Sequence, residues 1–173
     1  MLDAPIIDTN TYGEKFILFY GLNNPNSICS NWYKAEFTID NITFSCVEQY
    51  MMYMKAILFG DTYRAKMILN ETVPLEMKRL GRQVAGFVDS VWNDVRYGVV
   101  LLGVYNKFNQ NSDLKEWLLG VDVDYFVECN PRDRIWGIGM SRENDNAVYA
   151  QNWRGRNLLG SIIKTVQNKL KED

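Results

Sequence analysis

Short apolar runs in the chain alternate with segments whose apolar residues recur every three or four positions. The run Lys15–Tyr20 and the segments 32–39, 42–44 and 125–129 are rich in β-branched and aromatic residues, which predicts strands. Asp40-Asn41 lies between two of these segments, and both residue types tolerate tight turns, so residues 32–44 should form a hairpin.

Helical spacing dominates the rest of the chain. It predicts helices at residues 45–60, 61–69, 74–85, 89–108, 112–120 and 157–171. In the longest of them Val91, Val95, Val99 and Leu102 share one stripe, with Trp92 on the adjacent stripe. The pattern therefore predicts an α+β fold: a single, mostly helical domain over residues 1–173 with a small antiparallel sheet.

The start of the first helix carries the most informative carboxylate. Ser45 is followed three residues later by Glu48, a spacing typical of a capping box, so the helix should begin at Ser45. Val47 and Met51 mark its core face, and Glu48 lies next to that face in the first turn. Glu48 is either a helix cap or a carboxylate placed for chemistry.

Composition narrows that chemistry. The chain has 173 residues and a net charge of −2, with 19 basic and 21 acidic residues, which argues against a non-specific nucleic-acid binder. It contains no His, so Ser-His or Cys-His catalysis and His-based metal sites are excluded. Cys29, Cys46 and Cys129 fit no zinc spacing. We expect a cytoplasmic protein with no membrane span and no metal, in which Asp, Glu, Lys, Tyr or Cys supplies acid–base groups.

Residues 130–156 form a predicted loop that is rich in Arg and Gly. Gly137 and Gly139 flank one residue, which indicates close approach of the backbone to a ligand or to another chain segment. Asp133 lies between Arg132 and Arg134, where it is either a charged functional group or part of a solvated turn. The five Arg of the loop could bind phosphate, although loops also carry solvated Arg.

The last helix begins directly after this loop. Its N-terminus, at Gly155-Arg156-Asn157, offers backbone N–H groups suited to an anion. Asn157 as an ordinary N-cap explains the same residues without a ligand.

Several motifs in this order resemble the YbiA-like family of the NADAR group, over about residues 16–165. The motifs are Ser30-Asn31, Phe44-Ser45-Cys46-Val47-Glu48-Gln49-Tyr50 with Lys55-Ala56, Leu80-Gly81-Arg82, Trp92, Lys107-Phe108 with Gln110-Asn111, Glu128 to Gly139, and Trp153 to Gly160. Cys29 departs from the family pattern, which often has Leu before Ser-Asn.

The resemblance implies an N-glycosidase that needs no cofactor. Its substrate would be a riboflavin-pathway intermediate, or ADP-ribose attached to guanine in nucleic acid. It implies that Glu48 is catalytic and that Asp133 assists, with Glu128 as the alternative second carboxylate. Substrate-binding positions would be Asn31, Lys55, Trp92, Lys107, Trp136, Gly137, Gly139, Arg156 and Asn157. Two other readings stay open: a non-catalytic module that binds ADP-ribose or NAD, and a nucleic-acid-binding accessory protein.

Overall fold

A computed structural model describes residues 2–23 and 25–172. The chain divides into two compact units. Unit 1 is formed by the residues up to Tyr33 together with those from Ser112 onward, and unit 2 by Lys34–Asn111. Each unit is described by itself, and the expectation of a single domain stays a prediction.

Unit 1 contains a three-stranded sheet in the order β1-β2-β5. The strands are β1 (Asp8–Thr9), β2 (Lys15–Phe19) and β5 (Tyr125–Glu128). Strand β1 pairs antiparallel with β2, whereas β2 and β5 run parallel with Phe16 opposite Tyr125. The predicted purely antiparallel sheet is therefore wrong for this unit, because an apolar run predicts a strand but not the direction of its partner.

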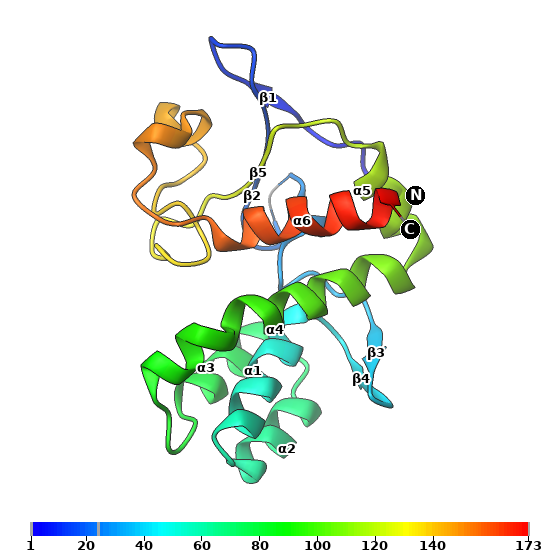
Figure 1. Cartoon of the computed structure of the whole chain (residues 1–173), viewed down its shortest axis with the longest axis vertical. Helices are drawn as coiled ribbons and strands as arrows, with labels where there is room; N and C mark the ends of the chain where they lie inside the picture. Colours follow the sequence, from blue (N-terminus) through cyan, green and yellow to red (C-terminus); the bar gives the residue numbers. More distant parts are fainter. Residues whose placement is uncertain (1, 24, 173) are drawn as a thin grey trace. The chain divides into compact units, whose positions relative to one another are not determined.

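In unit 1, α6 runs beside the sheet and α5 lies next to the C-terminal end of α6 (Figure 1). Helix α6 packs against β5 and α5. A buried cluster that includes Phe16, Leu18, Val127 and Ile138 joins the sheet to the loop that follows β5. The helical segments are η1 (Ser27–Cys29), α5 (Ser112–Gly120), η2 (Asp145–Val148), η3 (Ala150–Asn152) and α6 (Leu158–Glu172).

Unit 2 begins with the predicted hairpin. Strands β3 (Phe37–Ile39) and β4 (Ile42–Phe44) pair antiparallel. Asp40 and Asn41 have φ values of 51° and 64°. Two successive left-handed residues are the signature of the tight turn expected here, and these residue types adopt it at low cost.

Four helices follow, with α1 in contact with each of the other three. They are α1 (Val47–Leu58), α2 (Thr62–Asn70), α3 (Pro74–Arg82) and α4 (Asp89–Gln110). Helix α4 approaches α1 at Gly103, where an added Cβ would lie 2.8 Å from Cδ1 of Tyr50. Only a residue without a side chain allows the two helices to pack this closely.

The buried face of α4 is not its most apolar stripe. Val91, Val95 and Leu102 are exposed, while Trp92 and Arg96 are buried. The valine spacing therefore predicted the helix correctly but not its core face. The content is mostly helical with two small sheets, so the α+β assignment is confirmed. The sequence did not predict β1, and the first hairpin strand begins at Phe37 instead of residue 32. Within residues 2–23 and 25–172, no helix has the length and apolar character needed to cross a membrane.

Candidate active site

The first turn of α1 separates the two interpretations of Glu48. Helix α1 begins at Val47 with Cys46 as its N-cap, two residues later than a Ser45 start. Gln49 bonds back to Ser45: its Oε1 accepts from the Ser45 backbone N–H at 2.7 Å and from the Ser45 hydroxyl at 3.1 Å. The prediction that Ser45 caps the helix is therefore wrong, because the helix begins later, with Cys46 as its N-cap and Gln49 at the third position.

Gln49 also fixes the position of this turn within unit 2. Its Nε2 donates to the backbone oxygens of Ile68, Leu69 and Glu71 at 3.0 to 3.2 Å, at the end of α2. The side chain is only 3% exposed. A buried amide with all these partners holds the start of α1 rigidly, and Glu48 is held with it.

Glu48 is buried in a charged environment. The residue is 3% exposed, in the first turn of α1, where the partial positive charge of the helix favours an ionised carboxylate. Lys55 lies seven residues later and therefore on the same face of the helix. Burial raises the pKa of the neighbouring Cys46 thiol; the charge of Glu48 raises it further and that of Lys107 lowers it. Glu48 and Lys107 thus both act on one thiol.

Lys55 has an unusual setting for a lysine. Its Nζ lies 4.1 Å from the centroid of the Phe87 ring. Burial lowers the pKa of Lys55, and Arg82 lowers it further, while Asp89 and Glu48 oppose the shift. A partly desolvated ammonium interacts strongly with a substrate anion.

Helix α4 contributes a polar stripe from its buried face. Trp92, Arg96 and Lys107 are 7%, 7% and 1% exposed, and Gly103 on the same face meets α1. Arg96 is not among the residues that the sequence predicted to bind substrate. Its position four residues after Trp92 places it on the same stripe, and this spacing could have identified it. Two cations are thus buried on one helix face, and the guanidinium of Arg96 is of the type that pairs with a phosphate.

In unit 1, Asp133 organises the loop that follows β5. Its Oδ1 accepts from the backbone N–H groups of Ile135 and Trp136, both at 2.8 Å, and its carbonyl accepts from Gly139 at 3.1 Å. Asp133 therefore has a defined structural role in this turn. Its predicted assistance to catalysis stays a prediction, as does the role of Glu128.

The two glycines of this loop meet another chain segment. A Cβ on Gly137 would lie 2.8 Å from the carbonyl oxygen of Glu128. Gly139 has a φ of 68°, and a Cβ there would lie 3.2 Å from Cβ of Arg154. Both glycines are explained by packing within the unit, and substrate binding by their backbones stays a prediction.

The start of α6 is also built into this loop. The backbone N–H groups of Leu158 and Leu159 donate to Ile135 and Trp136, at 3.1 and 3.2 Å. The expected free N–H groups for an anion are therefore used by the loop. Asn157, at a φ of 51°, donates from Nδ2 to the Phe126 carbonyl at 2.8 Å and accepts at Oδ1 from the Glu128 N–H at 3.1 Å.

Asn31 offers an unused acceptor in unit 1. The residue is 7% exposed, and among the described residues nothing hydrogen-bonds to its Oδ1. A buried amide oxygen without a donor is costly, and a ligand N–H or O–H would remove that cost. This supports the predicted substrate-binding role of Asn31.

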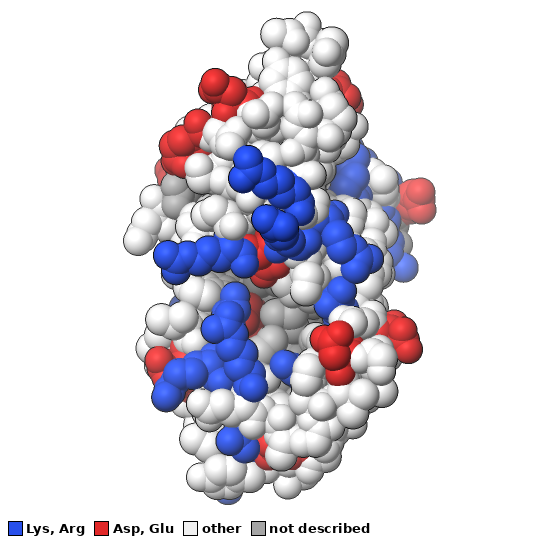
Figure 2. Space-filling model, turned by 90° about the vertical axis from the view of Figure 1, so that its left-hand side faces the viewer, with Lys and Arg blue, Asp and Glu red and all other residues white. Residues whose placement is uncertain are grey.

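Basic side chains gather on the side of unit 1 that carries residues 130–156 (upper half of Figure 2). In this loop Arg132, Arg134, Arg154 and Arg156 are exposed. The predicted contact of Arg156 with substrate stays a prediction.

The structure thus groups the predicted residues into two sets. In unit 2, Glu48 and Lys55 lie on α1, Trp92 and Lys107 lie on the buried face of α4, and the two helices pack against each other. Unit 1 joins Asp133, Trp136, Gly137, Gly139 and Asn157 in one hydrogen-bonded loop at the end of β5, and it also holds Asn31 and Arg156. Among the described residues, no group of three or more Cys, Asp or Glu side chains could hold a metal ion.

Comparison with known proteins identifies the family. Residues 18–171 match the model of the NADAR domain, which is nearly the whole chain. The chain belongs to the NADAR domain family. The resemblance predicted from the ordered motifs is confirmed.

Individual relatives extend this result. The chain is 33% identical over 164 residues to an N-glycosidase of Acanthamoeba polyphaga mimivirus, covering 90% of this chain and 96% of that protein. It is 26% identical over 159 residues to a riboflavin biosynthesis protein of Vibrio vulnificus, covering 92% of this chain and 40% of that protein. It is 24% identical over 157 residues to the N-glycosidase YbiA of Escherichia coli, covering 91% and 89%.

A solved structure shares the fold. The NMR structure of Escherichia coli YbiA superposes with a TM-score of 0.75 at 23% sequence identity, covering 98% of this chain and 89% of that one. The shared architecture supports the α+β, YbiA-like fold class.

Proposed function

We propose that this NADAR protein hydrolyses the N-glycosidic bond between a base and ribose, with Glu48 as the catalytic carboxylate. The observation that carries the proposal is the first turn of α1. Gln49 bonds back to Ser45 and fixes this turn, and the Glu48 carboxylate is buried within it. N-glycosidase relatives of similar length support the reaction class.

The chemistry of bond cleavage matches the residues of unit 2. An N-glycoside breaks through a cation-like sugar, which a nearby carboxylate stabilises. In a chain without His, Glu48 is also suited to orient and deprotonate the attacking water. Lys55 and Arg96 would pair with the phosphates of the substrate, and Trp92 offers an aromatic surface for a base or sugar.

We infer that the substrate is a ribosylated base: a riboflavin-pathway intermediate or ADP-ribose attached to guanine. The riboflavin biosynthesis protein of Vibrio vulnificus supports the first, and the buried cations of α4 suit the phosphates of either. Asp133, or Glu128 in its place, would assist Glu48.

The test compares wild type with Glu48→Gln, which keeps the shape of the side chain and removes its charge. Release of free base or ADP-ribose is measured on riboflavin-pathway intermediates and on ADP-ribosylated DNA and RNA. We expect turnover to fall by about 10²- to 10⁴-fold, the usual contribution of a positioned acid–base group.

Glu76→Gln is the matched control. Glu76 is a partly exposed carboxylate of the same unit that pairs with Arg79 at 2.7 Å, and the loss of its charge should leave turnover unchanged. Equal turnover of wild type and Glu48→Gln would remove Glu48 from the mechanism. Tight binding of ADP-ribose without product, unaffected by Glu48→Gln, would instead establish a non-catalytic binding module.

A further inference from the structure

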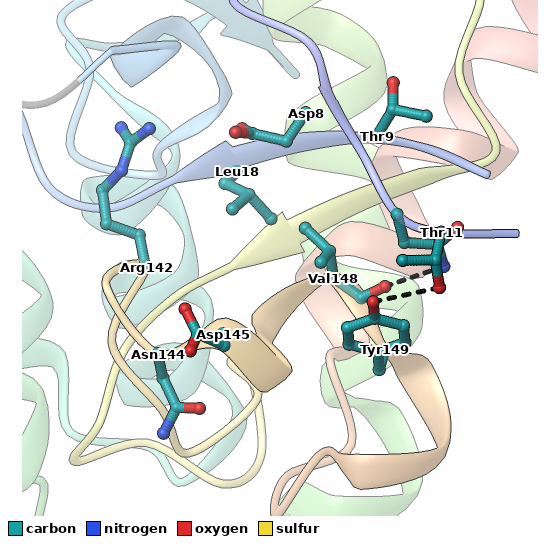
Figure 3. A pocket seen from close by; sticks show the side chains of 10 residues that line it. Asp8, Thr9, Thr11, Leu18, Arg142, Asn144, Asp145, Val148 and Tyr149 are labelled. Carbon is teal, nitrogen blue, oxygen red and sulfur yellow. Dashed lines mark hydrogen bonds between the residues drawn. The ribbon is translucent and has the colours of Figure 1, made fainter. Parts of the chain in front are cut away.

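Unit 1 contains a hollow that none of the predicted substrate-binding residues line. It has a volume of about 490 Å³, within the usual range for small-molecule sites. It lies between the antiparallel strand pair β1–β2 and the segment around η2 (Figure 3). Its walls are formed by Asp8, Thr9, Asn10, Thr11, Leu18, Arg142, Asn144, Asp145, Val148 and Tyr149.

The charged side chains of this hollow form no ion pair with each other or with another described residue. Asp8 and Arg142 both line it, yet neither forms an ion pair with any described residue. Oδ2 of Asp8 and one terminal guanidinium nitrogen of Arg142 are also enclosed without a hydrogen-bond partner among the described residues. An enclosed charge without a partner destabilises a fold. Because Asp8 is an anion and Arg142 a cation, a ligand that pairs with both must carry a cationic and an anionic group.

The geometry allows one ligand to reach both groups. In Figure 3 the Asp8 carboxylate, on β1, turns toward the side of the hollow where Arg142 lies. The last torsion of an Asp side chain rotates over a broad range, so either carboxylate oxygen can face the hollow. Asp8 then accepts hydrogen bonds from an ammonium group, and the Arg142 guanidinium binds a carboxylate through two nitrogens.

The walls of the hollow are held in place by hydrogen bonds. Thr11 Oγ1 and the Tyr149 hydroxyl lie 3.2 Å apart, and Asn10 Nδ2 donates to the Val148 carbonyl at 3.0 Å. These contacts connect the residues that follow β1 to the end of η2 along one side of the hollow (Figure 3). A site fixed in this way needs little reorganisation to accept a ligand.

A third charge decides the class of ligand. Asp145 is exposed and also lines the hollow without an ion pair, so the lining carries two carboxylates and one guanidinium. A ligand with one carboxylate and two cationic groups neutralises all three. We propose that this hollow binds a free basic amino acid, with its α-carboxylate on Arg142, its α-ammonium on Asp8 and its side-chain cation near Asp145.

The test is isothermal titration calorimetry of the full chain with L-lysine, L-alanine and cadaverine. L-Lysine should bind tightest. L-Alanine should bind about threefold more weakly, because the pair it lacks is with an exposed carboxylate. Cadaverine lacks the carboxylate for Arg142 and should bind at least about tenfold more weakly.

Variants separate this site from simple pairing of Asp8 with Arg142. Asp8→Asn and Arg142→Gln should each weaken L-lysine binding by about tenfold or more. Arg142→Lys keeps the charge but loses the two-nitrogen geometry, and it should weaken binding even where the other variants fail to fold. Asp122→Asn, at an exposed carboxylate of the same unit that pairs with Lys15, should bind as wild type does.

Three results would overturn the proposal. They are no heat with L-lysine up to millimolar concentrations, equal affinity for L-lysine and L-alanine, and wild-type affinity in Asp8→Asn and Arg142→Gln. The titration is independent of base release, so it stands or falls separately from the hydrolase function.

Discussion

At the scale of single residues, contacts decided between interpretations that the sequence left open. Glu48 and Gln49 are neighbours of similar size and polarity, and either could have bonded back to Ser45. The observed start of α1 assigns that bond to Gln49. Asp133 is the opposite case, because a residue predicted to assist catalysis also has a structural role in its own turn.

Two substitutions separate the roles of Asp133. Asp133→Asn keeps an oxygen that can accept from Ile135 and Trp136 but removes the charge, whereas Asp133→Ala removes both. We expect the Ala variant to lose about 1–2 kcal/mol in urea unfolding, and the Asn variant to lose about 0.5 kcal/mol or less.

If Asp133 assists Glu48, Asp133→Asn should also turn over substrate at least about tenfold more slowly. Wild-type turnover in a stable Asp133→Asn protein would leave the residue a structural role only.

Cys129 should make stability depend on alkaline pH. Burial raises the pKa of its thiol to about 12 from the usual 9.0. Below pH 9 the thiol is protonated in both states. Above it the unfolded chain releases the proton while the folded protein keeps it, so stability falls as pH rises toward 12. The loss approaches about 1.4 kcal/mol per pH unit.

The measurement is urea unfolding of wild type and Cys129→Ala at pH 8, 9.5 and 10.5. The stability difference between the two proteins should shift in favour of the variant as pH rises, because Ala has no proton to lose. A difference that is constant across the three pH values would show that the thiol titrates equally in both states.

At the scale of elements, periodicity located the helices well but did not identify their buried faces. Helix α4 carries a stripe of exposed valines and, beside it, the buried stripe with Trp92 and Arg96. Gly103 decides which of them faces α1, because it allows contact with Tyr50. A sequence pattern contains no information about which neighbour will pack against a helix.

The junction between α1 and α2 depends on Gln49. Gln49→Ala removes the acceptor for Ser45 and leaves the carbonyls at the end of α2 without their donor. We expect a loss of about 2–4 kcal/mol in chemical unfolding, since buried polar groups lose their partners.

Turnover should fall together with stability, because α1 positions Glu48. Gln151→Ala, at an exposed glutamine, is the control and should stay within about 0.5 kcal/mol of wild type. Wild-type stability of Gln49→Ala would show that water replaces the amide at no cost.

At the scale of the whole molecule, charge limits the partners. The net charge of −2 opposes non-specific attraction to nucleic acid, although the Arg-rich loop is locally basic. We expect no measurable binding of unmodified duplex DNA at about 0.15 M salt in fluorescence anisotropy, because few phosphates can be neutralised.

The same titration at about 0.05 M salt is the internal comparison for this prediction. Tight binding that weakens steeply as salt rises would favour the nucleic-acid accessory protein. If unmodified DNA does not bind, a substrate carried on DNA has to be recognised mainly through its modified base.

The sequence by itself determined the α+β class, the six α-helices, most of the strands, the tight turn at Asp40-Asn41 and membership of the NADAR domain family. It did not predict β1 or the short helical segments η2 and η3. Local spacing, turn chemistry and ordered motifs are properties of neighbouring residues, so they can be read along the chain. Only the tertiary structure decided the parallel pairing of β2 with β5, the buried face of α4 and the use of the first amides of α6. It also decided that Gln49 bonds to Ser45. Each of these depends on contacts between segments far apart in sequence, or on the residue at which a helix begins once it is packed.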